Sequence, residues 1–148
     1  MKKIENLNRR LSYFVNAVYK AESISYFEYT NDGEKTMTLV EEVRNLYNIA
    51  KCEPPSISLA TSVARLFDSY VEFYEELSPY DSRIPNPDEI FGDLKISELF
   101  GGVDIARNHI LKTRPKDKLM RYNAYFSFFF LKEAKPPYEA YLLYRSDV

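Results

Sequence analysis

The chain has 148 residues, of which 45% are apolar and 28% charged, and its formal net charge is −2. This composition is typical of a soluble globular protein, and the length suits a single domain, so disorder over the whole chain is excluded. There is no run of about eighteen apolar residues, which excludes an ordinary membrane-spanning helix, and a lone cysteine, Cys52, excludes an internal disulfide.

The first predicted element is an amphipathic helix over residues 4–21. Arg9 and Arg10 lie off its apolar face and are expected to point outward. That face is formed by residues at three- and four-residue steps, namely Ile4, Leu7, Leu11, Phe14, Val15 and Val18. The positive charge at the start precedes no apolar leader or small-residue cleavage site, so we expect a cytoplasmic protein without a secretory signal.

A short strand near residues 24–30 is predicted next, because ISYFEYT is rich in aromatic and β-branched residues and leads into an Asn-Asp-Gly turn. Thr38 and Glu41 have the spacing of a capping box, which predicts that a second helix begins there. Its apolar face consists of Leu39, Val43, Leu46, Tyr47 and Ala50. Pro54 and Pro55 end it.

A third helix is predicted from Ile57 to Leu77, and residues 78–87, with three prolines, are predicted to form a loop. The expected solvent face of this helix carries Asp68, Glu72, Glu75 and Glu76. Asn86 as cap and Pro87 at the first helical position predict a short helix, PDEIF. Two further helices are expected: ISELF, closed by Gly101-Gly102, and Val103 to Thr113, ended by Pro115.

The C-terminal residues 122–131 alternate in the manner of a strand, and YEAYLLYR (138–145) is predicted as a returning strand after the Lys-Pro-Pro turn. A helical interpretation of either segment stays open. The predicted fold class is mainly α (α+β): one domain, 1–148, with a compact helical body of four to six helices over 1–115. A small C-terminal antiparallel β-element over 116–148 completes it, with the strand near 24–30.

Catalytic patterns are weak. His109 is the single histidine and has no identifiable partner, while Cys52 precedes Glu53 at a helix end, where a thiolate is disfavoured. One His and one Cys cannot make a His/Cys metal site. Asp88 with Asp93-Leu94-Lys95 faintly echoes the carboxylates and lysine of metal-dependent nucleases, which require a strand there. We expect no enzyme, no cofactor and no metal, with a nuclease as the third hypothesis.

Acidic and basic residues are concentrated in different parts of the chain. Residues 68–104 carry ten acidic groups against two basic ones, whereas residues 105–148 carry nine basic groups against four acidic ones. Cations on one reachable surface are what phosphate recognition requires. The predicted nucleic-acid contacts are Arg107, His109, Lys112, Arg114, Lys116, Lys118 and Arg121, extended by Arg9 and Arg10, with Tyr122 and Tyr125 as stacking residues. The alternative is a solvated face that pairs with the chain's own acidic block.

Three stretches carry a family resemblance: LNRRLSYFVNAVYKAES, RNHILKTRPKDKL and the closing aromatic segment. Together they resemble the small subunit of archaeal type I-A CRISPR interference complexes. The resemblance implies a non-enzymatic subunit for antiviral defence, which lines up with copies of itself and helps hold guide–target nucleic acid. It implies no role for any single residue. The absence of Gln beside abundant Glu and Lys leans toward a thermophilic microbe or its virus.

The leading hypothesis is therefore a non-catalytic accessory subunit that contacts nucleic acid, as a single strand or a guide–target duplex, beside other protein subunits. The alternative from another class is a protein–protein adaptor or viral inhibitor. It would act through an acidic, tyrosine-rich surface, since the chain has thirteen tyrosines. A membrane partner is not expected.

Overall fold

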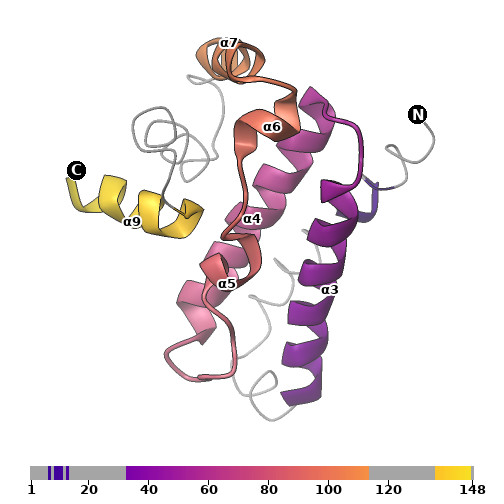
Figure 1. Ribbon diagram of the computed structural model, residues 1–148. Coiled ribbons are helices and arrows are strands. Elements are labelled where there is room, and N and C mark those ends of the chain that lie inside the picture. The colour runs from indigo at the N-terminus through magenta and orange to yellow at the C-terminus, as the bar shows by residue number, and fades with distance from the viewer. Residues whose placement is uncertain (1–6, 8, 12, 14–32, 114–135, 148) are drawn as a thin grey trace.

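A computed structural model describes residues 7, 9–11, 13, 33–113 and 136–147 of the chain. Within these ranges there is no strand, and the elements are α3 (Gly33–Lys51), α4 (Ile57–Leu77), α5 (Pro87–Phe91), α6 (Ile96–Phe100), α7 (Val103–Thr113) and α9 (Pro137–Asp147). Figure 1 shows α3 and α4 side by side, with α7 across one end of the pair and α9 on the side of α4 away from α3.

The hydrophobic core is organised around α4. Its residues 66–71 are all buried, and because consecutive residues pass around the helix, the middle of α4 is covered on every side. Phe91 of α5 is fully buried, and its ring centroid lies 4.8 Å from that of Tyr47 and 5.4 Å from that of Phe67. This aromatic cluster joins α3, α4 and α5.

Local capping explains where α4 begins. The Ser56 hydroxyl oxygen accepts a hydrogen bond from the Leu59 N–H at 3.0 Å, as an N-cap does. The N–H of Ser56 itself donates to the Leu99 carbonyl at 2.9 Å, which ties the start of α4 to α6. The predicted bounds of α4, residues 57 and 77, are confirmed.

The loop before α5 is also fixed by short-range bonds. Asn86 Oδ1 accepts from the Asp88 N–H at 2.9 Å, with Pro87 at the first helical position, so the predicted cap of PDEIF is confirmed. Tyr70 donates its hydroxyl to the Pro85 carbonyl at 2.8 Å. Burial raises the pKa of Tyr70 far above its usual value, which keeps the hydroxyl protonated as a donor.

Gly101 ends α6 in the predicted way. Its φ of 101° lies in the left-handed region that glycine tolerates, and its N–H donates to the carbonyls of Ser97 and Glu98. The N–H of Gly102 donates to Ser97 at 2.8 Å and completes the cap. The chain thereby turns sharply into α7, whose predicted bounds are confirmed.

The prediction of a returning strand over residues 138–145 is wrong, because residues 137–147 form helix α9. Pro137 suits the first helical position. The two carboxylate oxygens of Asp88 accept from the N–H groups of Tyr138 and Glu139 at 2.9 and 3.0 Å, so a residue of α5 caps α9. Tyr138, Tyr141 and Leu142 then pack toward the core at helical spacing. The first proposed strand, 122–131, lies outside the described residues.

The second predicted helix begins earlier than expected. Residues 33–38 already belong to α3, so Thr38 is not its cap and Gly33 is not a turn residue. Nothing in the stretch from Glu34 to Met37 interrupts a helix. Leu39 of the predicted apolar face is partly buried, and the rest of that face is buried, namely Val43, Leu46, Tyr47 and Ala50. The strand proposed near 24–30 falls outside the described part. The helical body is thus confirmed, whereas the α+β class is not supported within that part.

Candidate functional site

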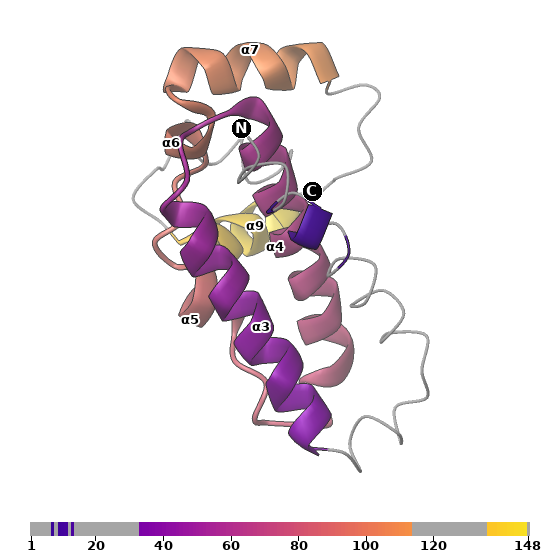
Figure 2. The ribbon, with the colours of Figure 1, turned by 90° about the vertical axis from the view of Figure 1, so that its right-hand side faces the viewer.

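Helix α7 is the part of the predicted basic strip that the structure describes. It packs on α6 through Ala106, which is fully buried, and through the His109 ring, whose centroid lies 5.3 Å from that of Phe100. Figure 2 shows α7 lying crosswise at the end of the molecule, over the ends of the long helices. One side of α7 therefore packs on the bundle, and the other faces solvent.

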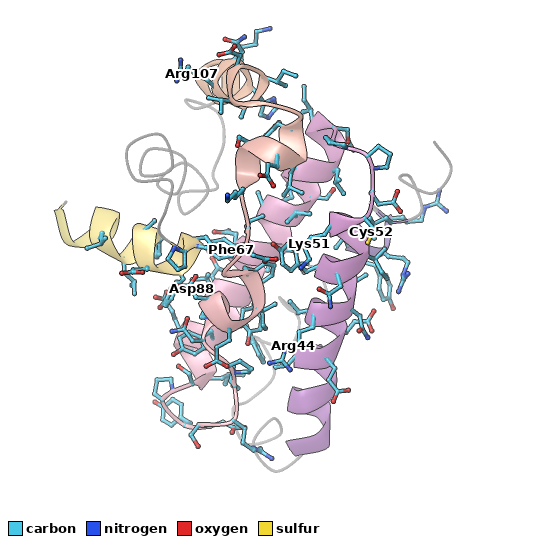
Figure 3. All side chains as sticks on the ribbon, viewed as in Figure 1. Arg44, Lys51, Cys52, Phe67, Asp88 and Arg107 are labelled. Carbon is cyan, nitrogen blue, oxygen red and sulfur yellow. The ribbon has the colours of Figure 1, made fainter. Side chains whose placement is uncertain are left out.

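The solvent side of α7 carries charged groups of both signs. Arg107 and Lys112 are exposed, and so is Asp104 in the first turn. Figure 3 shows Arg107 pointing outward from α7, away from the loop between α3 and α4. His109 is half-buried, between the bundle and solvent. The structure thus brings three of the predicted contact residues, Arg107, His109 and Lys112, onto one helix.

The other predicted contacts are placed elsewhere or lie outside the description. Arg9 and Arg10 are exposed, and one guanidinium nitrogen of Arg10 lies 3.6 Å from a Glu42 carboxylate oxygen of α3. In Figure 1 this N-terminal segment lies beside α3, in Figure 2 it lies in front of α4, and in both views it is separated from α7. Arg9 and Arg10 therefore do not continue the surface of α7. Outside the described residues lie Arg114, Lys116, Lys118, Arg121, Tyr122 and Tyr125.

The two carboxylates of the nuclease hypothesis, Asp88 and Asp93, have structural partners. Both oxygens of Asp88 cap α9, and burial raises the pKa of this carboxyl, partly offset by the two N–H donors. Asp93 and Lys95 stand in the connection between α5 and α6 and not on the strand that such a site requires. Among the described residues, no three His, Cys, Asp or Glu side chains gather in a way that would hold a metal ion.

Asp93 belongs to a cluster that the sequence did not indicate. It accepts the Tyr47 hydroxyl at 2.9 Å and the Lys51 ammonium at 3.0 Å, and Lys51 also lies 4.9 Å from the centre of the Tyr47 ring. Burial alone raises the pKa of Asp93, but the two donors outweigh it, so this pKa lies below its ordinary value. The sequence shows the four-residue spacing of Tyr47 and Lys51. It does not show their partner, because Asp93 lies more than forty residues away.

Two hollows flank the Lys51–Asp93 pair. One, of about 370 Å³, reaches toward Pro55 and Glu98, and the other, of about 400 Å³, lies between α3 and α5 and includes Arg44. In Figure 3 the labelled Arg44 and Lys51 both project from α3 toward α5. Charges of both signs line each hollow, and the second has a single aliphatic side chain in its lining, unlike the mostly apolar sites of small molecules.

The predicted acidic face of α4 is not an open surface. Asp68 is only 5% exposed, which corrects its assignment to the solvent side, because the middle of α4 is covered all round. Glu75 accepts the Tyr138 hydroxyl of α9 at 2.9 Å. Glu76 is exposed, and Glu72 is half-buried. The surface that the adaptor hypothesis needs is therefore partly used within the chain.

Cys52 is exposed just after α3. In the part of the chain that the structure describes, no helix combines the length and the apolar character needed to cross a membrane.

Comparisons of this chain with family models, with curated proteins and with solved structures found no match.

Proposed function

We propose that this protein is a non-catalytic accessory subunit that contacts nucleic acid through the α7 end of its helical bundle. The observation that supports this most is the placement of Arg107 and Lys112, both exposed on a helix that lies across the end of the molecule. Four further Lys or Arg follow within the next eight residues of the sequence, 114–121, against Asp117 alone. Such a run supplies the cations that a phosphate backbone attracts.

In this function the site binds its ligand and catalyses no reaction. The ligand is held by charge, so that its affinity is set by how many phosphates are neutralised and how much salt competes. A place in a larger ribonucleoprotein, as in the small subunits of CRISPR interference complexes, is the biological setting that we propose. It would account for a small, helical chain whose carboxylates Asp88 and Asp93 serve its own packing.

Fluorescence anisotropy with a labelled single-stranded oligonucleotide tests the proposal. We expect wild-type protein to bind at low salt and the double variant R107E/K112E to lose most of that binding. The matched control is R44E/R65E, which changes the net charge by the same amount at two exposed arginines of α3 and α4. Equal loss in both variants, or no binding by wild-type protein at low salt, would reject the proposal.

A further inference from the structure

An exposed apolar surface adjoins the start of α7. Gly101 adopts its left-handed conformation between Pro55 and Ile105, and all three residues are exposed, Ile105 to 45%. A Cβ atom built on Gly101 would lie 3.6 Å from the Pro55 Cβ and 3.7 Å from the Ile105 Cδ1. These three residues, here called the apolar platform, are therefore contiguous. Because Gly101 has no side chain, a flat group can approach its backbone.

The helical period links the platform to one edge of α7. Ile105, His109 and Lys112 are spaced i, i+4 and i+7, so they follow one another along the same side of the helix. Lys112 is exposed about 10 Å beyond Ile105 along the axis. Val103 and Arg107 occupy the other edge, and Figure 3 shows Arg107 directed away from the α3–α4 loop that carries Pro55.

The geometry points to a single strand as the ligand, with one base lying on the apolar platform and neighbouring phosphates at Lys112. This inference rests on the function proposed above and narrows its ligand to nucleic acid with unpaired bases. A paired base keeps its faces inside the duplex stack, whereas a single strand can offer a base face to an apolar surface. The platform then supplies a contact that is independent of charge.

The charges around the platform favour a strand whose base lies on the platform and whose phosphates lie at Lys112. The neighbouring carboxylates of Glu98 and Asp104 are exposed and repel phosphate, so the platform itself suits the neutral base. Lys112, further along the same edge, is where the phosphate charge is compensated.

Two oligomers with the same number of phosphates separate the base contact from the charge contact. One is oligothymidylate of about 20 nucleotides, and the other is an abasic oligomer of equal length, which keeps the backbone but lacks bases. We expect wild-type protein to bind oligothymidylate about two- to threefold more tightly, which is less than stacking on an aromatic ring provides, because the platform is aliphatic. Lys112→Gln should weaken binding of both oligomers to a similar degree.

Substitutions of the two side chains of the platform, Ile105 and Pro55, complete the test. Ile105→Ser and, separately, Pro55→Ser should remove the preference for oligothymidylate and leave abasic binding unchanged. Val103→Ser is the matched control, since Val103 is 40% exposed on the other edge of α7, and it should keep the preference. Unchanged thermal melting confirms that each variant is folded.

Different results would reject nucleic-acid binding at α7 and the base contact at the platform. If wild-type protein binds neither oligomer at low salt, the proposed function and this inference both fall. If both oligomers bind equally well, or if Ile105→Ser and Pro55→Ser keep the wild-type preference, only the base contact is overturned. Variants that keep the wild-type preference are also expected if the platform binds an apolar side chain of a protein partner or of a second copy.

Discussion

At the scale of single residues, Asp93 ties the connection between α5 and α6 to two side chains of α3. It accepts from Tyr47, which is 2% exposed, and from Lys51. Asp93→Ala removes the acceptor of a part-buried hydroxyl and should cost about 0.5–1.5 kcal/mol of unfolding free energy. Asp93→Asn keeps an acceptor oxygen and should cost less. Urea denaturation measures both, and equal costs would show that the Tyr47 bond contributes nothing.

The Asp81–Arg83 pair makes a pH dependence testable. Arg83 donates to the two Asp81 oxygens at 2.9 and 2.8 Å, and these bonds lower the pKa of Asp81 below its ordinary value of 3.8. Because the pKa is lowered in the folded chain, the stabilisation is present above pH 3.8 and is lost as the pH falls through the lower folded value.

Arg83→Gln should therefore lower stability by a constant amount between about pH 5 and 7, and wild-type and variant should converge in more acidic solution. Chemical denaturation at a series of pH values measures this difference. A gap that stays constant down to about pH 2 would contradict the role of the carboxylate charge.

Asp104 is a charge that opposes the proposed ligand. It is exposed on the same helix as Arg107 and Lys112. Asp104→Asn should tighten oligonucleotide binding by about two- to fivefold at low salt, and the gain should shrink as salt screens the repulsion. Glu76→Gln, which neutralises an exposed carboxylate of α4, is the comparison that should leave binding unchanged. Weaker binding by the Asp104 variant would contradict a phosphate ligand at α7.

At the scale of elements, α9 depends on a cap supplied by α5. Asp88→Ala removes both acceptors of the Tyr138 and Glu139 N–H groups and should cost about 0.5–2 kcal/mol. Hydrogen exchange should accelerate at these two amides before it does in α4. The control, Glu89→Ala, removes the neighbouring exposed carboxylate of α5 and should leave α9 protected. Equal protection in both variants would mean that the cap does not hold α9.

The sequence predicted those elements whose boundaries are set by nearby residues. Ser56, Asn86 and Gly101 act on groups two to four positions away, so the limits of α4, α5 and α6 followed from local patterns. The helix α9 was misassigned because its cap, Asp88, lies fifty residues earlier in the chain. Its aromatic residues also have strand propensity, which packing overrides here.

At the scale of the whole molecule, the sequence shows which segments are charged, but it does not show which of these charges share a surface in the fold. The exposure of Arg107 and Lys112 agrees with the predicted basic strip, whereas Arg10 lies beside Glu42 of α3. Asp68 was placed on a solvent face by its helical phase alone, and its burial follows from helices and loops that surround α4. Such long-range packing leaves no periodic pattern in the sequence.

The fold places α7 at one end of the bundle, with Arg107 and Lys112 exposed on it (Figure 2). Binding there should be governed by counterion release, which makes salt the most direct probe of the account. The two described cations, Arg107 and Lys112, should each contribute to the salt dependence.

The deciding measurement is the slope of log affinity against log salt concentration for a single-stranded oligonucleotide, with wild-type protein and with R107Q/K112Q. If both side chains neutralise phosphates, the variant's slope should be shallower by about 1.4, or roughly 0.7 for each contact. Equal slopes for the two proteins, or no binding by wild-type protein at low salt, would contradict the account.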